Sequence, residues 1–267
     1  MVNQKTPKEC FQELEADLMA IAENVIVFNT MPYEVATQEG LRMSALAEKY
    51  HDQLIKSDID PAYLDTIYER AGAFAYCVAV MDSFIEVSQN HKEIYIIKKK
   101  EGYELRRRLL DTLEYVFRFD NTIPSAIENI KRGAGDLDMI RDLNAIHLLC
   151  TENLDRLIKA HVDQSLIDMA QQYFKELSQL TAKIDIDPKK ISEARLMCGR
   201  AWTYLWEAMK EIYAAGRFVF YSEPDILELF YIDYYQRMGK ISTKNTEDKE
   251  AIPEKEEEST ETSTSVV

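Results

Sequence analysis

The sequence predicts an all-α fold: a tandem duplication of an up-and-down four-helix bundle, followed by a disordered acidic C-terminal tail. Three observations support this prediction. Only 8 Gly and 7 Pro occur among 267 residues, a composition that favours long helices over many short strands. Apolar residues recur every three or four positions through most of the chain, as in amphipathic helices. Short patterns also recur between the two halves.

The first helix is expected to begin at a capping box. Thr6 supplies an N-cap hydroxyl, Pro7 suits the first helical position, and Glu9 stands three residues after the cap. The spacing then predicts one apolar helical face through Phe11, Leu14, Leu18, Ile21, Val25 and Phe28.

The remaining periodic segments complete two sets of four helices. In the first half they begin near residues 35, 60 and 103. In the second half they cover about 137–160, 166–182, 188–216 and 225–238. Pro124, Gly133 and Gly135 interrupt the pattern between the halves. The predicted organisation is therefore a first bundle at 1–119, a linker at 120–135, a second bundle at 136–240 and the acidic tail at 241–267.

The tetrapeptide Asp-Ile-Asp-Pro occurs at residues 58–61 and again at 185–188. A paired calcium site is one interpretation, but the loops lack the glycine and distal glutamate of an EF-hand. Helix capping explains both copies, with Asp60 and Asp187 as N-caps before a proline. Together with the matched residues Tyr76 and Tyr204, the two copies indicate an internal repeat at an offset of 127 or 128 residues.

Charge and cysteine content restrict the class of protein. A formal net charge of -15 makes nucleic acid an unlikely partner and disfavours an anionic membrane surface. The four cysteines form no CxxC motif, which predicts buried free thiols in a reducing compartment. No secretory signal or span of about 20 apolar residues is evident. We therefore expect a cytoplasmic protein that does not bind membranes.

No motif for metal, cofactor or catalysis stands out. A di-metal helical bundle needs two Glu-x-x-His motifs, and only Glu48-x-x-His51 fits. Glycine-rich phosphate loops, the dinucleotide fingerprint and the nucleophile elbow are also missing. We accordingly expect no metal site, no cofactor and no catalytic residues.

Two groups of residues remain as candidate sites. A ligand pocket in a bundle core would be formed by aromatic residues and one arginine: Tyr76, Arg200, Trp202, Tyr204 and Trp206. An interaction surface would combine a basic segment with C-terminal tyrosines: Lys98, Lys99, Lys100, Arg106, Arg107, Arg108, Tyr231, Tyr234 and Tyr235. For the basic segment, a solvated helical surface is the alternative interpretation.

The sequence therefore favours a non-enzymatic helical interaction or scaffold protein, with a protein partner or self-association. A small-ligand-binding bundle, or an enzyme with its site in a bundle core, is the alternative. Such a site predicts a pocket in which several polar groups converge. The identity of any small molecule stays open at this stage.

Overall fold

A computed structural model describes residues 5–232 and 234 of the chain. Every secondary-structure element in this part is helical, and it contains no strand, which confirms the predicted all-α class. Contacts divide the chain into two compact units: residues 1–75 with 199–267 form unit 1, and residues 76–198 form unit 2. This division differs from the predicted halves, and the predicted tail at 241–267 lies outside the described residues.

Unit 1 is assembled from both ends of the chain. Its N-terminal part contains α1 (Pro7–Ala20), η1 (Glu23–Val25), α2 (Tyr33–Lys49), α3 (His51–Leu54) and η2 (Ile55–Ser57). The start of α4 (Pro61–Val116) and the end of α8 (Gln164–Val219) complete it, with α9 (Pro224–Leu227) and η3 (Glu228–Phe230). Its core is rich in aromatic rings: Phe74 packs on Trp202, and Phe230 stacks on Phe220.

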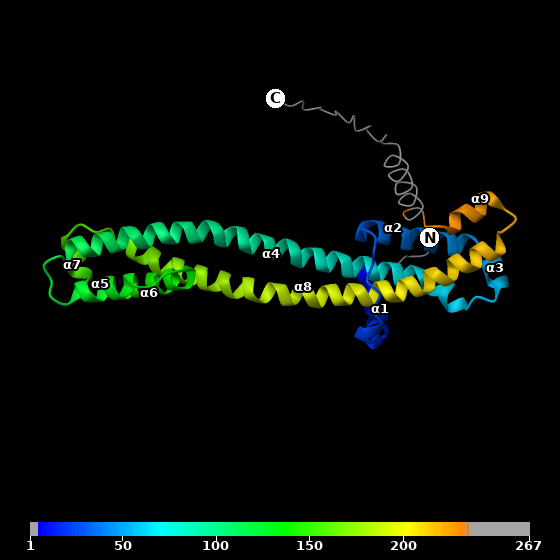
Figure 1. The fold of residues 1–267 in the computed structure, drawn as a ribbon, viewed down its shortest axis with the longest axis horizontal. Coiled ribbons are helices and arrows are strands. Elements are labelled where there is room, and N and C mark those ends of the chain that lie inside the picture. Colours follow the sequence, from blue (N-terminus) through cyan, green and yellow to red (C-terminus); the bar gives the residue numbers. More distant parts are fainter. Residues whose placement is uncertain (1–4, 233, 235–267) are drawn as a thin grey trace, which may run out of the picture. The chain divides into compact units, whose positions relative to one another are not determined.

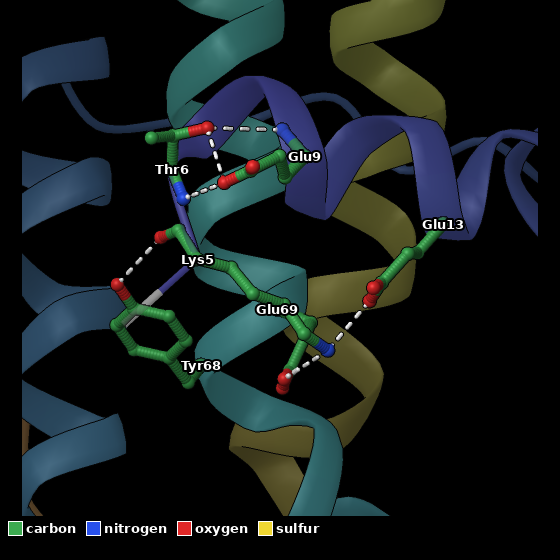
Figure 2. A network of polar contacts seen from close by, with 6 residues as sticks. All are labelled: Lys5, Thr6, Glu9, Glu13, Tyr68 and Glu69. Carbon is green, nitrogen blue, oxygen red and sulfur yellow. Dashed lines mark hydrogen bonds and ion pairs between the residues drawn. The ribbon is translucent and has the colours of Figure 1, made fainter. Parts of the chain in front are cut away.

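The predicted capping box at the start of α1 is confirmed. The backbone N–H of Glu9 donates to Thr6 Oγ1 at 3.3 Å, and the N–H of Thr6 donates to Glu9 Oε2 at 2.7 Å (Figure 2). The same end of α1 is tied to α4, because Tyr68 donates to the carbonyl of Lys5, and Lys5 Nζ lies 3.1 Å from Glu69 Oε1. Local and tertiary contacts thus agree on where this helix begins.

The predicted apolar helix through Phe28 was wrong beyond α1, which ends at Ala20. Apart from the single turn of η1, residues 21–31 are not helical. The backbone of this segment forms hydrogen bonds with side chains of α8 instead. Arg200 Nε donates to the carbonyl of Ile21, and the N–H of Val27 donates to Thr203 Oγ1 at 2.8 Å. Side chains that are distant in sequence have replaced the helical hydrogen bonds that the periodicity predicted.

Unit 2 combines the later part of α4 and the earlier part of α8 with α5 (Ile123–Lys131), α6 (Asp136–Glu152) and α7 (Leu154–Lys159), seen at the green end of the ribbon in Figure 1. One core cluster joins all five helices. On α4 the cluster extends from Leu105 to Phe117, and on α8 it ends at Leu177. Before Leu105 on α4, the partly buried Tyr95 also packs against this cluster.

Two pairs of predicted helices are in fact single helices of 56 residues each, α4 and α8. Pro188 lies inside α8, so the predicted N-cap at Asp187 was wrong. The long helix accommodates the missing amide hydrogen, and Asp187 is buried against α4, 2.8 Å from His91 Nδ1. The first cap is confirmed, because Asp60 Oδ1 accepts from the N–H of Ala62 at the start of α4.

Two pairs of helices in the described chain correspond at an offset of 103 residues, α2 with α6 and α4 with α8, while the predicted repeat at 127 or 128 residues is not confirmed. α2 and α6 contain 17 residues each, and α4 and α8 contain 56 each. Just before each long helix stands one residue in the left-handed region, Asp58 (φ 62) or His161 (φ 60). Leu-Ile-Lys also occurs at 54–56 and again at 157–159.

Side-chain roles recur at the same offset. Asp163 Oδ1 accepts from the N–H of Ser165 at 2.9 Å, as Asp60 does at the start of α4. Other positions share their burial in pairs: Glu39 with Asp142, Phe117 with Phe220, and Ile127 with Phe230. Each pair contributes one residue to unit 1 and one to unit 2. The predicted tandem bundles are not confirmed, whereas this second register is consistent across caps, turns and core positions.

Candidate functional site

In unit 2, a groove of about 1030 Å³ lies between the last turns of α4 and the first turns of α8. We call it the α4/α8 groove. On α4 its lining begins at Glu101 and ends at Val116, a rise of about 22 Å along the helix axis. Its apolar lining comes from both helices and from Val162 just before α8; the helical residues are Leu105, Val116, Leu166, Met169 and Tyr173.

Charged side chains of α4 form the rim of this groove: Glu101, Glu104, Arg107, Arg108 and Asp111. At one end, Tyr173 donates to Glu101 Oε2 at 2.7 Å. Burial, together with this carboxylate, raises the pKa of Tyr173. At the other end, the ring of Tyr115 is 68% exposed. An apolar floor with a rim of both charges suits a protein segment better than a small polar substrate.

The predicted basic segment is divided between paired and unpaired residues. Lys98 Nζ lies 3.2 Å from Glu176 Oε2, and this hydrogen bond raises the pKa of Lys98. Lys99 bonds to Asp136 at 3.0 Å. These two lysines therefore tie α4 to α8 and α6, and Lys100 lies exposed beside them.

The three arginines of that segment also differ in role. Arg106 lies 2.7 Å from Asp142 Oδ2, which is buried on α6. Arg107 and Arg108 line the α4/α8 groove. A hydrogen bond from the backbone lowers the pKa of Asp163, and the charge of Arg108 contributes to this shift. Of the three predicted arginines, these two place their charge on the groove.

The residues of the predicted ligand pocket point to different neighbours. Trp202 stacks on Trp206 with 5.4 Å between ring centroids, while Arg200 donates to the carbonyl of Ile21. The ring of Tyr204 lies 3.7 Å below the guanidinium of Arg70. Trp206 lines an opening of about 330 Å³ in unit 1.

Tyr76 belongs to unit 2, unlike the other four residues of that set. Among the predicted surface tyrosines, Tyr231 is partly exposed, and its ring lies 5.5 Å from the guanidinium of Arg217. Tyr234 is half-buried, and Tyr235 lies outside the described residues. These tyrosines are distant in sequence from the basic segment and belong to the other unit.

A buried polar cluster in unit 1 escaped the sequence analysis. Glu39 on α2 accepts from both Arg42 and the hydroxyl of Tyr213 on α8. Arg42 also donates to the carbonyls of Leu229 at 2.7 Å and Tyr231 at 3.0 Å. Burial and the Glu39 carboxylate hold the pKa of Tyr213 well above its ordinary value. The cluster fastens the segment after α8 to the bundle and is a structural element.

The four cysteines are buried and unpaired, as predicted. Burial raises the pKa of Cys150 and of Cys198 to about 12, and it also raises the pKa of Cys10 and Cys77. Since the thiolate is the nucleophile, we expect the native protein at pH 8 to react slowly with a disulfide reagent, and all four thiols to react after denaturation. Rapid labelling of any thiol in the native protein would contradict this expectation.

Within the described residues, no group of three or more His, Cys, Asp and Glu side chains is arranged to hold a metal ion. Among those residues α4 is long and apolar enough to span a membrane by length and composition alone. A core helix of a soluble protein passes the same test, and 44% of the relevant α4 window is buried. Comparison with protein-family models, curated proteins and solved structures finds no match to this chain.

Proposed function

We propose that this chain is a non-enzymatic helical interaction protein, and that its α4/α8 groove receives a helix of a protein partner. The observation that carries the proposal is the groove itself, which has an apolar floor and a charged rim between two long helices, with partly exposed Met169 and exposed Tyr115 on it. Its length along α4 matches a helix of about 15 residues. A partner helix would pack there as the missing member of a helical bundle.

The chemistry of the groove supports binding more than catalysis. Its lining residues include neither His nor Cys, the usual general base and thiol nucleophile near neutral pH. Glu101 is occupied by the hydroxyl of Tyr173. The alternative site, around Trp202 and Tyr204, has no observation that favours it, because those side chains do not face a common pocket.

A photo-crosslinking amino acid at two exposed aromatic positions tests this proposal. Tyr115 lines the groove, whereas Phe119 is 86% exposed and does not. In extract of the source cells, we expect one protein to be crosslinked from position 115 and not from position 119. With that partner purified, Met169→Glu should weaken binding at least tenfold, and Leu148→Glu on exposed α6 should not.

Three results would overturn the proposal. Equal crosslinking from positions 115 and 119 would remove the groove from the interaction. Unchanged binding by the Met169→Glu variant would do the same. A small molecule retained at one equivalent in native mass spectrometry of the purified protein would instead favour the ligand-binding alternative. A dimer that Met169→Glu dissociates would identify a second copy as the occupant.

We also propose that the chain arose by duplication of a segment of about 100 residues, in the register of 103 residues. The equal lengths of the paired helices support this, as do the left-handed residues at 58 and 161 and the aspartate caps at 60 and 163. In this register each unit takes the start of one long helix and the end of the other. We propose this arrangement in place of the two independent tandem bundles that the sequence predicted.

A cytoplasmic location and a protein partner are part of the same proposal. Four buried thiols, free of disulfides, are typical of a reducing compartment. The net charge of -15 opposes binding to nucleic acid or to anionic lipid. We propose no cofactor.

A further inference from the structure

The middle of α4 carries a second series of mainly apolar positions, which α8 covers only in part. Towards α8, Val78, Met81, Ile85 and Ser88 are buried or half-buried at spacings of three and four residues. A parallel series with the same spacing lies beside that contact: Phe84, Val87, His91 and Ile94. We call this series the α4 seam. Its three apolar members are exposed, Val87 by 48%.

The spacing of the α4 seam is that of a coiled-coil contact, in which a partner helix inserts side chains between successive a and d positions. His91 occupies one of these positions. Its Nδ1 lies 2.8 Å from Asp187 Oδ2, and the Asp187 side chain is almost fully buried. A polar residue at a single a position is a feature that sets the register of paired helices.

The flank of the seam on α8 is apolar and basic. Phe84 and Val87 line an opening of about 290 Å³ with Ile186, which is 52% exposed, and with Lys183 and Lys190. The two lysines are seven residues apart, one heptad. Their ammonium groups form no ion pair with the described residues. The only carboxylate of this opening belongs to Asp187, which is already bonded to His91.

We infer that the α4 seam is a docking surface for an acidic amphipathic helix of a partner protein. Apolar residues in heptad spacing would pack against Phe84, Val87 and Ile94, and acidic residues one heptad apart would pair with Lys183 and Lys190. Charge complementarity is the argument for this occupant, because Lys183 and Lys190 line the opening beside the seam and the Asp187 carboxylate there is bonded to His91. The inference uses other residues than the α4/α8 groove and does not depend on the proposed function.

Two synthetic helical peptides of about three heptads test the inference on the full chain. Both carry Leu and Ile at a and d; the acidic probe has Glu at e and g, and the basic probe has Lys there. By fluorescence anisotropy we expect the acidic probe to bind at least tenfold more tightly than the basic one. The variant with Lys183→Glu and Lys190→Glu should reverse that preference.

Matched variants locate the binding. Lys189→Glu changes the same charge on the same helix, but Lys189 does not line the opening, so the preference should persist. Val87→Asp should abolish binding of the acidic probe, while Met169→Glu in the α4/α8 groove should leave it unchanged. Circular dichroism melts establish that each variant is folded, and the lysine variants at exposed positions serve if Val87→Asp does not fold.

Several outcomes would overturn the inference. Failure of the acidic probe to bind, equal binding of both probes, or a preference that survives reversal of Lys183 and Lys190 would each do so. Binding that Met169→Glu abolishes would place the probe in the groove. A concentration-dependent dimer in sedimentation experiments that Val87→Asp dissociates would show that a second copy occupies the seam.

Discussion

Gly216→Ala is expected to lower the free energy of unfolding by about 3 kcal/mol. A Cβ atom at this position would lie 2.0 Å from Cδ1 of Phe230, far closer than two carbon atoms can approach. The ring of Phe230 is fully buried, stacked on Phe220 and tilted against Tyr50. Overpacking costs about 1–3 kcal/mol and loss of a buried Phe about 3–5 kcal/mol, so either response is costly.

Urea denaturation followed by tryptophan fluorescence measures this effect, because both tryptophans, Trp202 and Trp206, lie in unit 1 with Gly216. Gly102→Ala is the matched control. There a new Cβ would lie 3.2 Å from the flexible ends of Leu177 and Met139, and the gain in helix propensity of about 1 kcal/mol offsets the closer contact. We expect Gly102→Ala to change stability by less than about 1 kcal/mol.

Combining Gly216→Ala with Phe230→Ala tests the mechanism. If the two residues interact as the structure indicates, the double variant should lose less stability than the two single losses together. Strict additivity, or a Gly216→Ala variant at least as stable as the parent, would contradict the close approach of Phe230 to α8. Helix propensity alone would make the Gly216→Ala variant at least as stable as the parent, because Ala is more favourable than Gly inside a helix.

Asp142→Ala is expected to cost about 3–5 kcal/mol, the range for breaking a buried ion pair from one side. The side chain of Asp142 is only 3% exposed, and its Oδ2 accepts from Nε of Arg106 at 2.9 Å and lies 2.7 Å from Nη2. Arg106 also donates to the carbonyl of Ile130. Loss of the carboxylate therefore leaves a largely buried guanidinium without its counter-charge at the junction of α4, α5 and α6.

Urea denaturation followed by far-ultraviolet circular dichroism measures this loss. Glu193→Ala is the control, because its pair with Lys189 spans 3.9 Å at an exposed surface and should contribute less than about 0.5 kcal/mol. Replacing Arg106 with Met and Asp142 with Leu together should recover much of the stability, since an apolar pair leaves no uncompensated charge. A loss below about 1 kcal/mol in Asp142→Ala would show that the pair is solvent-accessible.

Local features of the fold were predictable wherever neighbouring residues alone decide the structure. The capping box at Thr6 and the cap at Asp60 are confirmed, because each depends on a few adjacent atoms. The sequence predicted the repeat from the two copies of Asp-Ile-Asp-Pro as helix starts. Asp187 of the second copy, however, lies inside a helix. The less conspicuous Leu-Ile-Lys at 54–56 and 157–159 was the signal for the register of 103 residues.

The candidate sites were less predictable, because a helical period does not identify the neighbour of each face. Arg106 and Arg108 belong to one basic segment, yet Arg106 forms an ion pair with Asp142, whereas Arg108 lines the α4/α8 groove. Likewise Tyr204 packs on Arg70, on another side of α8 than Trp202 and Trp206, which stack on each other. Adjacent helical positions differ by about 100° in direction, so closeness in sequence did not bring these side chains together.

By itself the sequence determined the helical class, the first caps and the burial of the four thiols, because composition, periodicity and short-range hydrogen bonds are local properties. Only the tertiary structure decided that α4 and α8 each continue for 56 residues, that residues 21–31 bond to α8, and which apolar positions stay exposed. The physical reason is that an apolar helical face becomes core or docking surface according to what packs against it.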